Sequence, residues 1–271
     1  QIAHASLAKK QRAMVILGGL LVAVALVLYW LFGVEVALLY LLVLCAAELL
    51  AYLMVRFIGI PNGFFATERH PQIAPDIVNR FADHGYDSEL GWVRKANSSK
   101  LDSGCQYVID EHGSRKGYQE KYTGTLVSTY GDSYTFCREC EDSETWQYYL
   151  GDRLKSKVLN YGVGNYGFDQ SLIRLKREFP NCPTPVVIIG VVPQTIARIL
   201  SVWKHYNEHG NTLAFKPRFK VVDGQLVMIE NPISSLDKYY QLDSLLPDVQ
   251  DNDYYYSRRF VRESLRFPFL L

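Results

Sequence analysis

The chain has 271 residues, enough for one sizeable domain and a further segment. Its 29 basic and 28 acidic residues nearly balance, so the composition excludes a protein that binds nucleic acid through a general excess of positive charge. Apolar residues are concentrated near the N-terminus, and this is the most informative feature of the composition.

Two apolar segments of about twenty residues each follow a basic N-terminal flank. The first runs from Ala13 to Phe32 without a charge, and the second, from Val36 to Val55, contains only Glu48. The pattern predicts a transmembrane hairpin over residues 13–57, with a break at Gly33. A buried core hairpin and a cleaved signal peptide are the alternatives, although uncharged runs of this length are unusual in both. Because a carboxylate is costly in lipid, we expect Glu48 to meet a protein partner or to lie near the interface.

The segment after the hairpin predicts a connector and then a regular α/β domain. A short helix is expected over residues 75–81, followed by irregular and strand-like segments. Strands are then predicted at 125–130, 157–160 and 186–192, the last one buried, and helices at 144–154, 169–179 and 194–203. Strands and helices that alternate at this spacing predict a parallel sheet with helices on both faces.

These predictions divide the chain into five parts. They are an N-terminal flank (1–12), the hairpin (13–57), a connector (58–120), the α/β domain (121–233) and a C-terminal extension (234–271). The chain begins with Gln1 and ends in the apolar sequence LRFPFLL, so we expect the protein to extend beyond both ends.

Three polar or glycine-rich positions follow the three predicted strands. Ser133, Gly162 and Gln194 each come just after one of them. Ligands of parallel sheets bind beyond the C-terminal ends of the strands, so we expect these residues around one cleft. Ser133 could be a nucleophile or could cap the helix that follows, but a cap alone does not account for the other two positions.

Three segments of the chain resemble sequence blocks of the SGNH (GDSL-type) hydrolase family, in order and at similar spacing. They are GDSYTF (131–136), NYGVGNYGFDQ (160–170) and VVIIGVVPQTIAR (186–198). DHGYDSELGW and the predicted hairpin FKVVDGQLVMIENP, which turns at Asp223 and Gly224, resemble membrane-anchored members, so the likeness covers residues 80–232. The resemblance implies a three-layer α/β/α sandwich. It also implies that Ser133 is the nucleophile, with Gly162 and Gln194 at the oxyanion-hole positions beside the Ser133 N–H.

The chain departs from the family pattern in two places. Where the family has an Asn followed by Asp, this chain has Gln194 and Thr195, and the extra methylene moves the amide by about 1.5 Å. The family also has a C-terminal Asp-x-x-His, whose His accepts the serine proton, but no histidine follows His209. We expect His84, His205 and His209 to be ordinary packing or surface residues, with His209 the first candidate for the base.

Two functions follow, and whether the chain is an enzyme stays open. The departures favour a non-catalytic structural or interaction subunit at the membrane. The alternative is a serine ester hydrolase, such as an O-deacetylase or a lipid or glycan esterase, whose Asp-x-x-His lies beyond residue 271. Expected partners are membrane lipid and a protein at the membrane, with a small acyl ester as substrate only if the chain is active. No nucleic acid, cofactor or metal is expected, because the lone CxxC of Cys137 and Cys140 lacks further ligands for zinc.

The cysteines and the basic residues point to opposite sides of the membrane. Cys105, Cys137, Cys140 and Cys182 are an even number in the soluble part, and we expect one disulfide, either Cys137–Cys140 or Cys105–Cys182. The basic residues that flank the hairpin favour a cytoplasmic domain by the positive-inside rule. Since anchored members of the resembling family generally hold this domain outside the cytoplasmic membrane, we expect the extracytoplasmic (periplasmic) side.

Overall fold

The structure is a computed structural model that describes residues 2–59, 71–102, 104–117, 120–265 and 269, with the side chains of residues 2–12 left out. The chain forms two compact units. The helical unit comprises Gln1–Gln72, His205–Thr212 and Asp253–Leu271. The α/β unit comprises Ile73–Lys204 and Leu213–Asn252, so it includes much of the segment that the sequence assigns to a connector.

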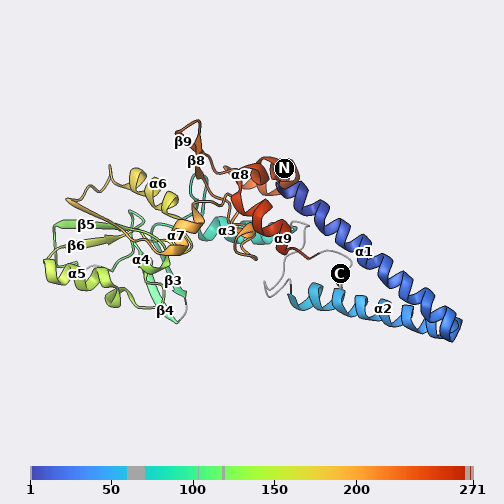
Figure 1. The fold of residues 1–271 in the computed structure, drawn as a ribbon. Coiled ribbons are helices and arrows are strands. Elements are labelled where there is room, and N and C mark those ends of the chain that lie inside the picture. The colour runs from blue at the N-terminus through green and yellow to red at the C-terminus, as the bar shows by residue number, and fades with distance from the viewer. Residues whose placement is uncertain (1, 60–70, 103, 118–119, 266–268, 270–271) are drawn as a thin grey trace. The chain divides into compact units, whose positions relative to one another are not determined.

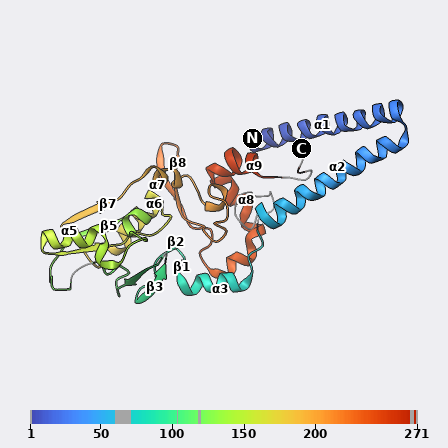
Figure 2. The same ribbon diagram turned by 90° about the horizontal axis from the view of Figure 1, so that it is seen from below.

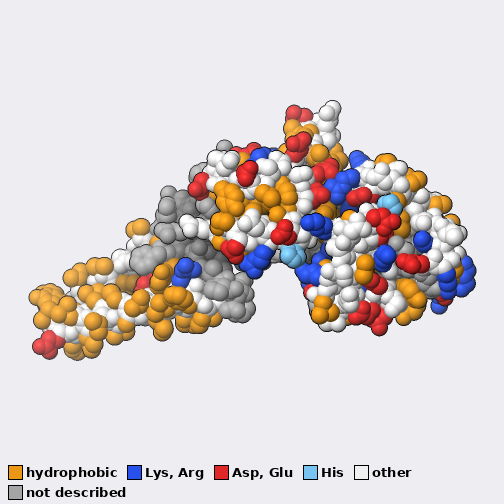
Figure 3. Space-filling view, turned by 180° about the vertical axis from the view of Figure 1, so that it is seen from behind, with side chains coloured by type: hydrophobic (Ala, Val, Ile, Leu, Met, Phe, Trp, Pro, Cys, Tyr) orange, Lys and Arg blue, Asp and Glu red, His pale blue; other side chains and the backbone are white. Residues whose placement is uncertain are grey.

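Two long helices form the N-terminal part of the helical unit. Helix α1 (Ile2–Phe32) and helix α2 (Val34–Met54) form a hairpin at Gly33, whose φ of +90° suits glycine (Figure 1). A π-helical turn, Val55–Gly59, continues α2. Both Ala13–Phe32 and Val34–Gly59 are long and apolar enough to cross a membrane, and only 0% and 6% of them is buried. Apolar side chains cover the outside of this hairpin (Figure 3), which argues against the alternative of a buried core hairpin.

The helical unit also contains the end of the described chain. A π-helical turn (Tyr256–Phe260) is followed by α9 (Val261–Glu263). The Phe269 N–H donates to the carboxylate of Glu48, and the Phe269 ring lies 6.0 Å from the Tyr52 ring. Within this unit Glu48 therefore contacts the backbone of the same chain, and its contact with a protein partner or its position near the interface stays a prediction.

A three-stranded parallel sheet forms the centre of the α/β unit. Strand β5 (Thr125–Tyr130) lies between β6 (Lys157–Asn160) and β7 (Val186–Ile189). Thr129 is opposite Asn160 on one side and Ile188 on the other. The second half of β5 is buried because it is the central strand.

Helices follow each strand of this sheet. They are α4 (Ser133–Phe136) after β5, then α5 (Trp146–Leu154), α6 (Phe168–Glu178) after β6, and α7 (Pro193–Arg198) after β7. A 3-10 turn (Asp142–Glu144) precedes α5. Because β6 and β7 flank β5, right-handed crossovers place α5 and α6 on opposite sides of the sheet, as Figure 1 shows.

Shorter elements complete the α/β unit. Helix α3 (Pro75–His84) is followed by the hairpins β1 (Tyr86–Asp87) with β2 (Gly91–Trp92) and β3 (Ser98–Asp102) with β4 (Cys105–Ile109), which Figure 2 shows along one side of the unit. A third hairpin joins β8 (Arg218–Val222) to β9 (Gln225–Ile229). Helix α8 (Leu242–Asn252) follows a 3-10 turn (Leu236–Gln241), and a further 3-10 turn covers Lys204–Tyr206.

The structure confirms the predicted α/β character and corrects two elements. The third predicted strand was expected to be buried, but β7 is short and its Val186 is 49% exposed, because β7 is an edge strand. The helix predicted at 194–203 ends at Arg198. Its predicted last residue, Trp203, instead pairs with Phe215 in an isolated β-bridge and stacks on its ring at 4.8 Å.

Candidate active site

Ser133 is the first residue of α4, directly beyond the central strand. Two glycines at the strand ends make this position possible. A Cβ at Gly131 would lie 2.1 Å from Thr135 Oγ1, and one at Gly190 would lie 2.3 Å from the same atom. The ends of β5 and β7 therefore approach the start of α4 more closely than any side chain would allow.

Asp132, not Ser133, caps this helix. Its carboxylate accepts a hydrogen bond from the Tyr134 N–H at 3.0 Å and lies 3.4 Å from Arg198 Nη1. This arrangement neutralises a buried carboxylate and fixes the turn. The Ser133 hydroxyl is not used for capping, and among the described residues it has no hydrogen-bond partner. The capping alternative from the sequence is therefore wrong for the serine itself.

Ser133 lines a hollow of about 670 Å³ inside the α/β unit. The walls come from the end of α3, the segment after β2, α4 with the turn that follows it, and the loop after β6. His84 belongs to the same lining. Its Nδ1 lies 2.6 Å from the Arg80 carbonyl oxygen, which can only accept a hydrogen bond. In the neutral ring Nδ1 therefore carries the proton, and Nε2 carries the lone pair.

The loop after β6 contributes Val163, Gly164 and Asn165 to the hollow. Gly162, the predicted oxyanion position, is not among the lining residues, and its N–H donates to Asn160 Oδ1 at 3.0 Å. A Cβ at Gly162 would lie 2.4 Å from the Phe136 nitrogen, so this glycine allows the loop to pack on α4. Asn165 adopts a left-handed conformation with φ of +70°, which turns the chain at the wall of the hollow.

The residues after β7 form the N-terminal turn of α7. Gln194 is exposed and is not among the residues that line the hollow. Thr195 is buried, where its hydroxyl donates to the Val192 carbonyl and accepts from the Val192 N–H. The oxyanion roles of Gly162 and Gln194 stay predictions that these contacts do not support.

His209 belongs to the helical unit, together with His205. Its Nδ1 lies 3.3 Å from the His205 carbonyl oxygen, and its Nε2 lies 3.9 Å from the Glu263 carboxylate. Burial, and then the neighbouring His209, lower the pKa of His205 to about 4. The role of His209 as base stays a prediction.

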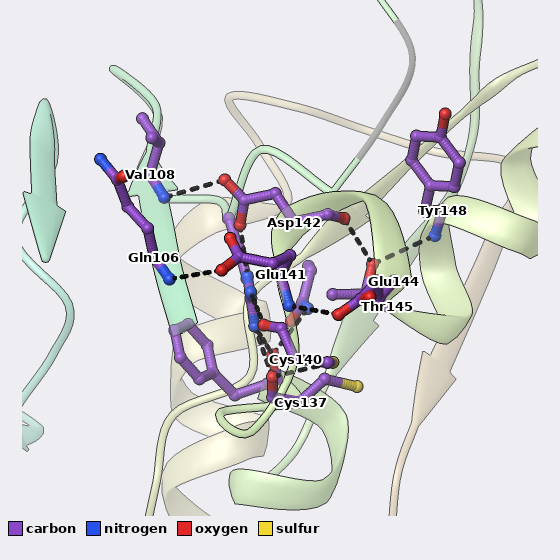
Figure 4. A network of polar contacts seen from close by, with 12 residues as sticks. Gln106, Val108, Cys137, Cys140, Glu141, Asp142, Glu144, Thr145 and Tyr148 are labelled. Atoms are coloured by element: carbon purple, nitrogen blue, oxygen red, sulfur yellow. Dashed lines mark hydrogen bonds and ion pairs between the residues drawn. The ribbon is translucent and has the colours of Figure 1, made fainter. Parts of the chain in front are cut away.

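The CxxC pair lies in the wall of the same hollow as Ser133. Arg115 holds this turn: its guanidinium pairs with Asp142 at 2.6 Å and donates to the carbonyls of Cys137 and Cys140. Figure 4 shows Asp142, Cys137 and Cys140 in this network of polar contacts. Burial, followed by the proximity of Cys137, raises the pKa of the Cys140 thiol. The Cys140 thiol donates to the Cys137 carbonyl at 3.3 Å.

All five cysteines are free thiols in this structure, so neither predicted disulfide, Cys137–Cys140 or Cys105–Cys182, is formed. Within the described ranges, no group of three or more His, Cys, Asp and Glu side chains is arranged to hold a metal ion.

The sequence reasoning missed the place of His84 and Arg94 in this lining. Both belong to the segment around DHGYDSELGW, whose likeness to anchored hydrolases was the available signal.

A comparison with protein-family models finds no match, and a comparison with curated proteins finds no significant match.

Proposed function

We propose that the α/β unit is a serine ester hydrolase with an SGNH-like three-layer sandwich, anchored in a membrane by the α1–α2 hairpin. One observation carries this proposal. An uncommitted serine beyond the central strand and a histidine with a free Nε2 line one hollow. Nucleophilic catalysis by serine requires this combination of groups.

The chemistry follows from these two side chains. His84 Nε2 takes the proton of Ser133 as Oγ forms a bond to the acyl carbon of the ester. The imidazolium then gives that proton to the alcohol as its bond to the acyl carbon breaks. Water, deprotonated by the same nitrogen, then attacks the acyl carbon of the acyl-serine. The bond from Ser133 Oγ to that carbon breaks, the imidazolium returns its proton to Oγ, and the carboxylic acid is released. Ser133 and His84 line the same hollow without a hydrogen bond between them, and in this scheme that bond forms when substrate binds.

The oxyanion would be stabilised by backbone donors at the hollow. The Ser133 N–H and the N–H groups of Gly164 and Asn165 belong to residues that line it. Because these backbone N–H groups can donate hydrogen bonds to the oxyanion, the scheme does not require the side-chain amide of the exposed Gln194.

A second function is a binding or interaction subunit at the membrane without catalysis. The Gly162 N–H is bonded to Asn160, and Gln194 lies outside the lining. The Gly162 N–H is therefore committed to another acceptor, and no contact supports an oxyanion role for Gln194. A hollow of this size would still bind a ligand without cleaving it.

Esterase assays on the full chain in detergent distinguish the two functions. With 4-nitrophenyl acetate, we expect Ser133→Ala and His84→Gln each to lower kcat/KM by at least about 100-fold. His209→Gln is the matched control and should change the rate by less than about twofold. A rate that is unchanged in Ser133→Ala would support the non-catalytic function. Loss in His209→Gln but not in His84→Gln would remove His84 from the mechanism.

A further inference from the structure

The side chain of Arg94 also lines the hollow of Ser133. The segment that carries it is fixed by three hydrogen bonds. Trp92 Nε1 donates to the Gly164 carbonyl at 3.0 Å, the Tyr166 hydroxyl donates to the Trp92 carbonyl at 2.6 Å, and the Val93 N–H donates to Gly85. The position of Arg94 relative to the loop after β6 is therefore set by the fold.

The guanidinium of Arg94 lies close to two aromatic rings, Tyr107 and Phe136, which are edge-to-face with each other. Its Cζ lies 4.7 Å from the Phe136 ring centroid and 5.1 Å from that of Tyr107. Nη1 donates to the Tyr107 hydroxyl at 2.6 Å. Nε is buried and has no hydrogen-bond partner among the described residues, and Nη2 borders Gly164, another lining residue.

Other arginines of the α/β unit show what a structural guanidinium looks like here. Arg115 stacks on the same two rings, but it pairs with Asp142 and donates to three backbone carbonyls. Arg198 pairs with Asp132, and Arg174 lies 3.9 Å from Glu178. Arg94 differs in that no described carboxylate lies within ion-pair distance of it; its unbonded buried Nε is a feature that it shares with Arg174.

The remaining charges of the lining do not neutralise Arg94. Among the described residues of the lining, Glu139 alone is acidic, and it pairs with the exposed Arg138 at 3.7 Å. His84 adds a further positive charge when it is protonated. Arg94 therefore lines the hollow of Ser133 without a carboxylate partner there, and it also borders a second hollow whose lining includes Glu111 and Glu178.

We propose that Arg94 binds an oxyanion, a carboxylate or phosphate group, on the ligand that occupies this hollow. A guanidinium presents parallel N–H donors that match two oxygens of such a group, and the hydrogen bond from Nη1 to the Tyr107 hydroxyl positions it. Combined with the proposed function, the substrate is an ester that carries a negative charge. The binding step does not require hydrolysis, so it can be tested separately from the proposed function.

Calorimetry with the full chain in detergent tests the binding step, with succinate, inorganic phosphate and the neutral succinamide as probes. We expect an anion to bind at least about tenfold more tightly than succinamide. Arg94→Gln removes the guanidinium that lies over Phe136 and should lower the affinity for the anion at least about tenfold, without changing that for succinamide. Arg138→Gln is the matched control, since Arg138 lines the hollow but is exposed and paired, and should change affinity less than about twofold.

The nitrogen resonance of Arg94 Nε in the unmodified chain gives a readout that does not depend on a variant's folding, and we expect it to shift on titration with the anion. Binding of succinate alone identifies a carboxylate ligand, and binding of phosphate alone a phosphate ligand. Equal binding of succinate and succinamide, no binding of either anion, or an unshifted Arg94 resonance would overturn the inference. Arg94-dependent binding in a chain without Ser133-dependent esterase activity would support the inference and reject the proposed function.

Discussion

At the scale of single residues, Gly131, Asp132 and Ser133 each have a different role. Glycine allows the strand end to meet Thr135, the aspartate caps α4 and pairs with Arg198, and the serine lies at the hollow with no hydrogen-bond partner for its hydroxyl in the described part of the chain. A serine that served as the cap would have its hydroxyl committed to the backbone. The uncommitted hydroxyl is therefore the feature that favours chemistry or ligand binding at this position.

Gly162 is predicted to act through packing. In Gly162→Ala the new Cβ would lie 2.4 Å from the Phe136 nitrogen, a backbone atom that cannot move without shifting α4. We expect a loss of about 2–4 kcal/mol in the free energy of unfolding, measured by denaturant titration. Gly164→Ala is the control, because its nearest atom is Arg94 Nη2 at 3.9 Å, and it should cost less than about 1 kcal/mol. Equal stability of the two variants would contradict the packing role.

At the scale of elements, local patterns were sufficient to predict the centre of the sheet. The strands at 125–130 and 157–160 have the predicted bounds, because each is a short apolar run that ends at a turn. The edge position of β7 and the early end of α7 could not be predicted, since strand order and the Trp203–Phe215 bridge depend on contacts distant in sequence. The lining of the hollow could not be predicted either, because it brings together segments that are distant in sequence: α3, the segment after β2 and the loop after β6.

The histidine cluster of the helical unit predicts a dependence of stability on pH. His205 is buried against Phe260, and its Nδ1 accepts from the Gly210 N–H at 3.2 Å, so the neutral ring is the folded form. Its pKa falls from 6.5 to about 4 on folding. The unfolded chain therefore binds more protons between these values. Stability is full above pH 6.5 and declines as the pH falls toward 4, by up to about 3 kcal/mol.

Thermal melting of the helical signal between pH 7 and 4.5 measures this effect. His205→Gln, which removes the titrating ring, should flatten the decline, whereas His112→Gln, at an exposed site of the α/β unit, should leave it unchanged. A decline as steep in His205→Gln as in the original chain would assign the effect to other groups.

At the scale of the whole molecule, a helical unit with an apolar, outward-facing hairpin belongs to the same chain as an α/β unit with a cationic hollow. The first 59 residues are rich in apolar side chains that no protein core buries, and a membrane-spanning hairpin accounts for them. Membrane anchorage would confine the proposed hydrolase to substrates at or near the lipid surface.

The chain's own cysteines can be used to test on which side of the membrane the α/β unit lies. If the α/β unit is extracytoplasmic, a membrane-impermeant maleimide should label the half-buried Cys105 in intact cells. Cys45, which lies in α2 within the apolar span, should stay unlabelled under the same conditions. Labelling of Cys105 only after lysis would place the unit in the cytoplasm, as the basic residues around the hairpin suggest.

Covalent labelling of the serine tests the central claim most directly. The full chain in detergent is treated with a fluorophosphonate, which reacts with activated serines, and the modified residue is identified by mass spectrometry. We predict an adduct on Ser133, at a rate at least about 100-fold lower in His84→Gln and unchanged in His209→Gln. A chain that forms no adduct at Ser133, or that forms it at the same rate without His84, would contradict a Ser133–His84 active site.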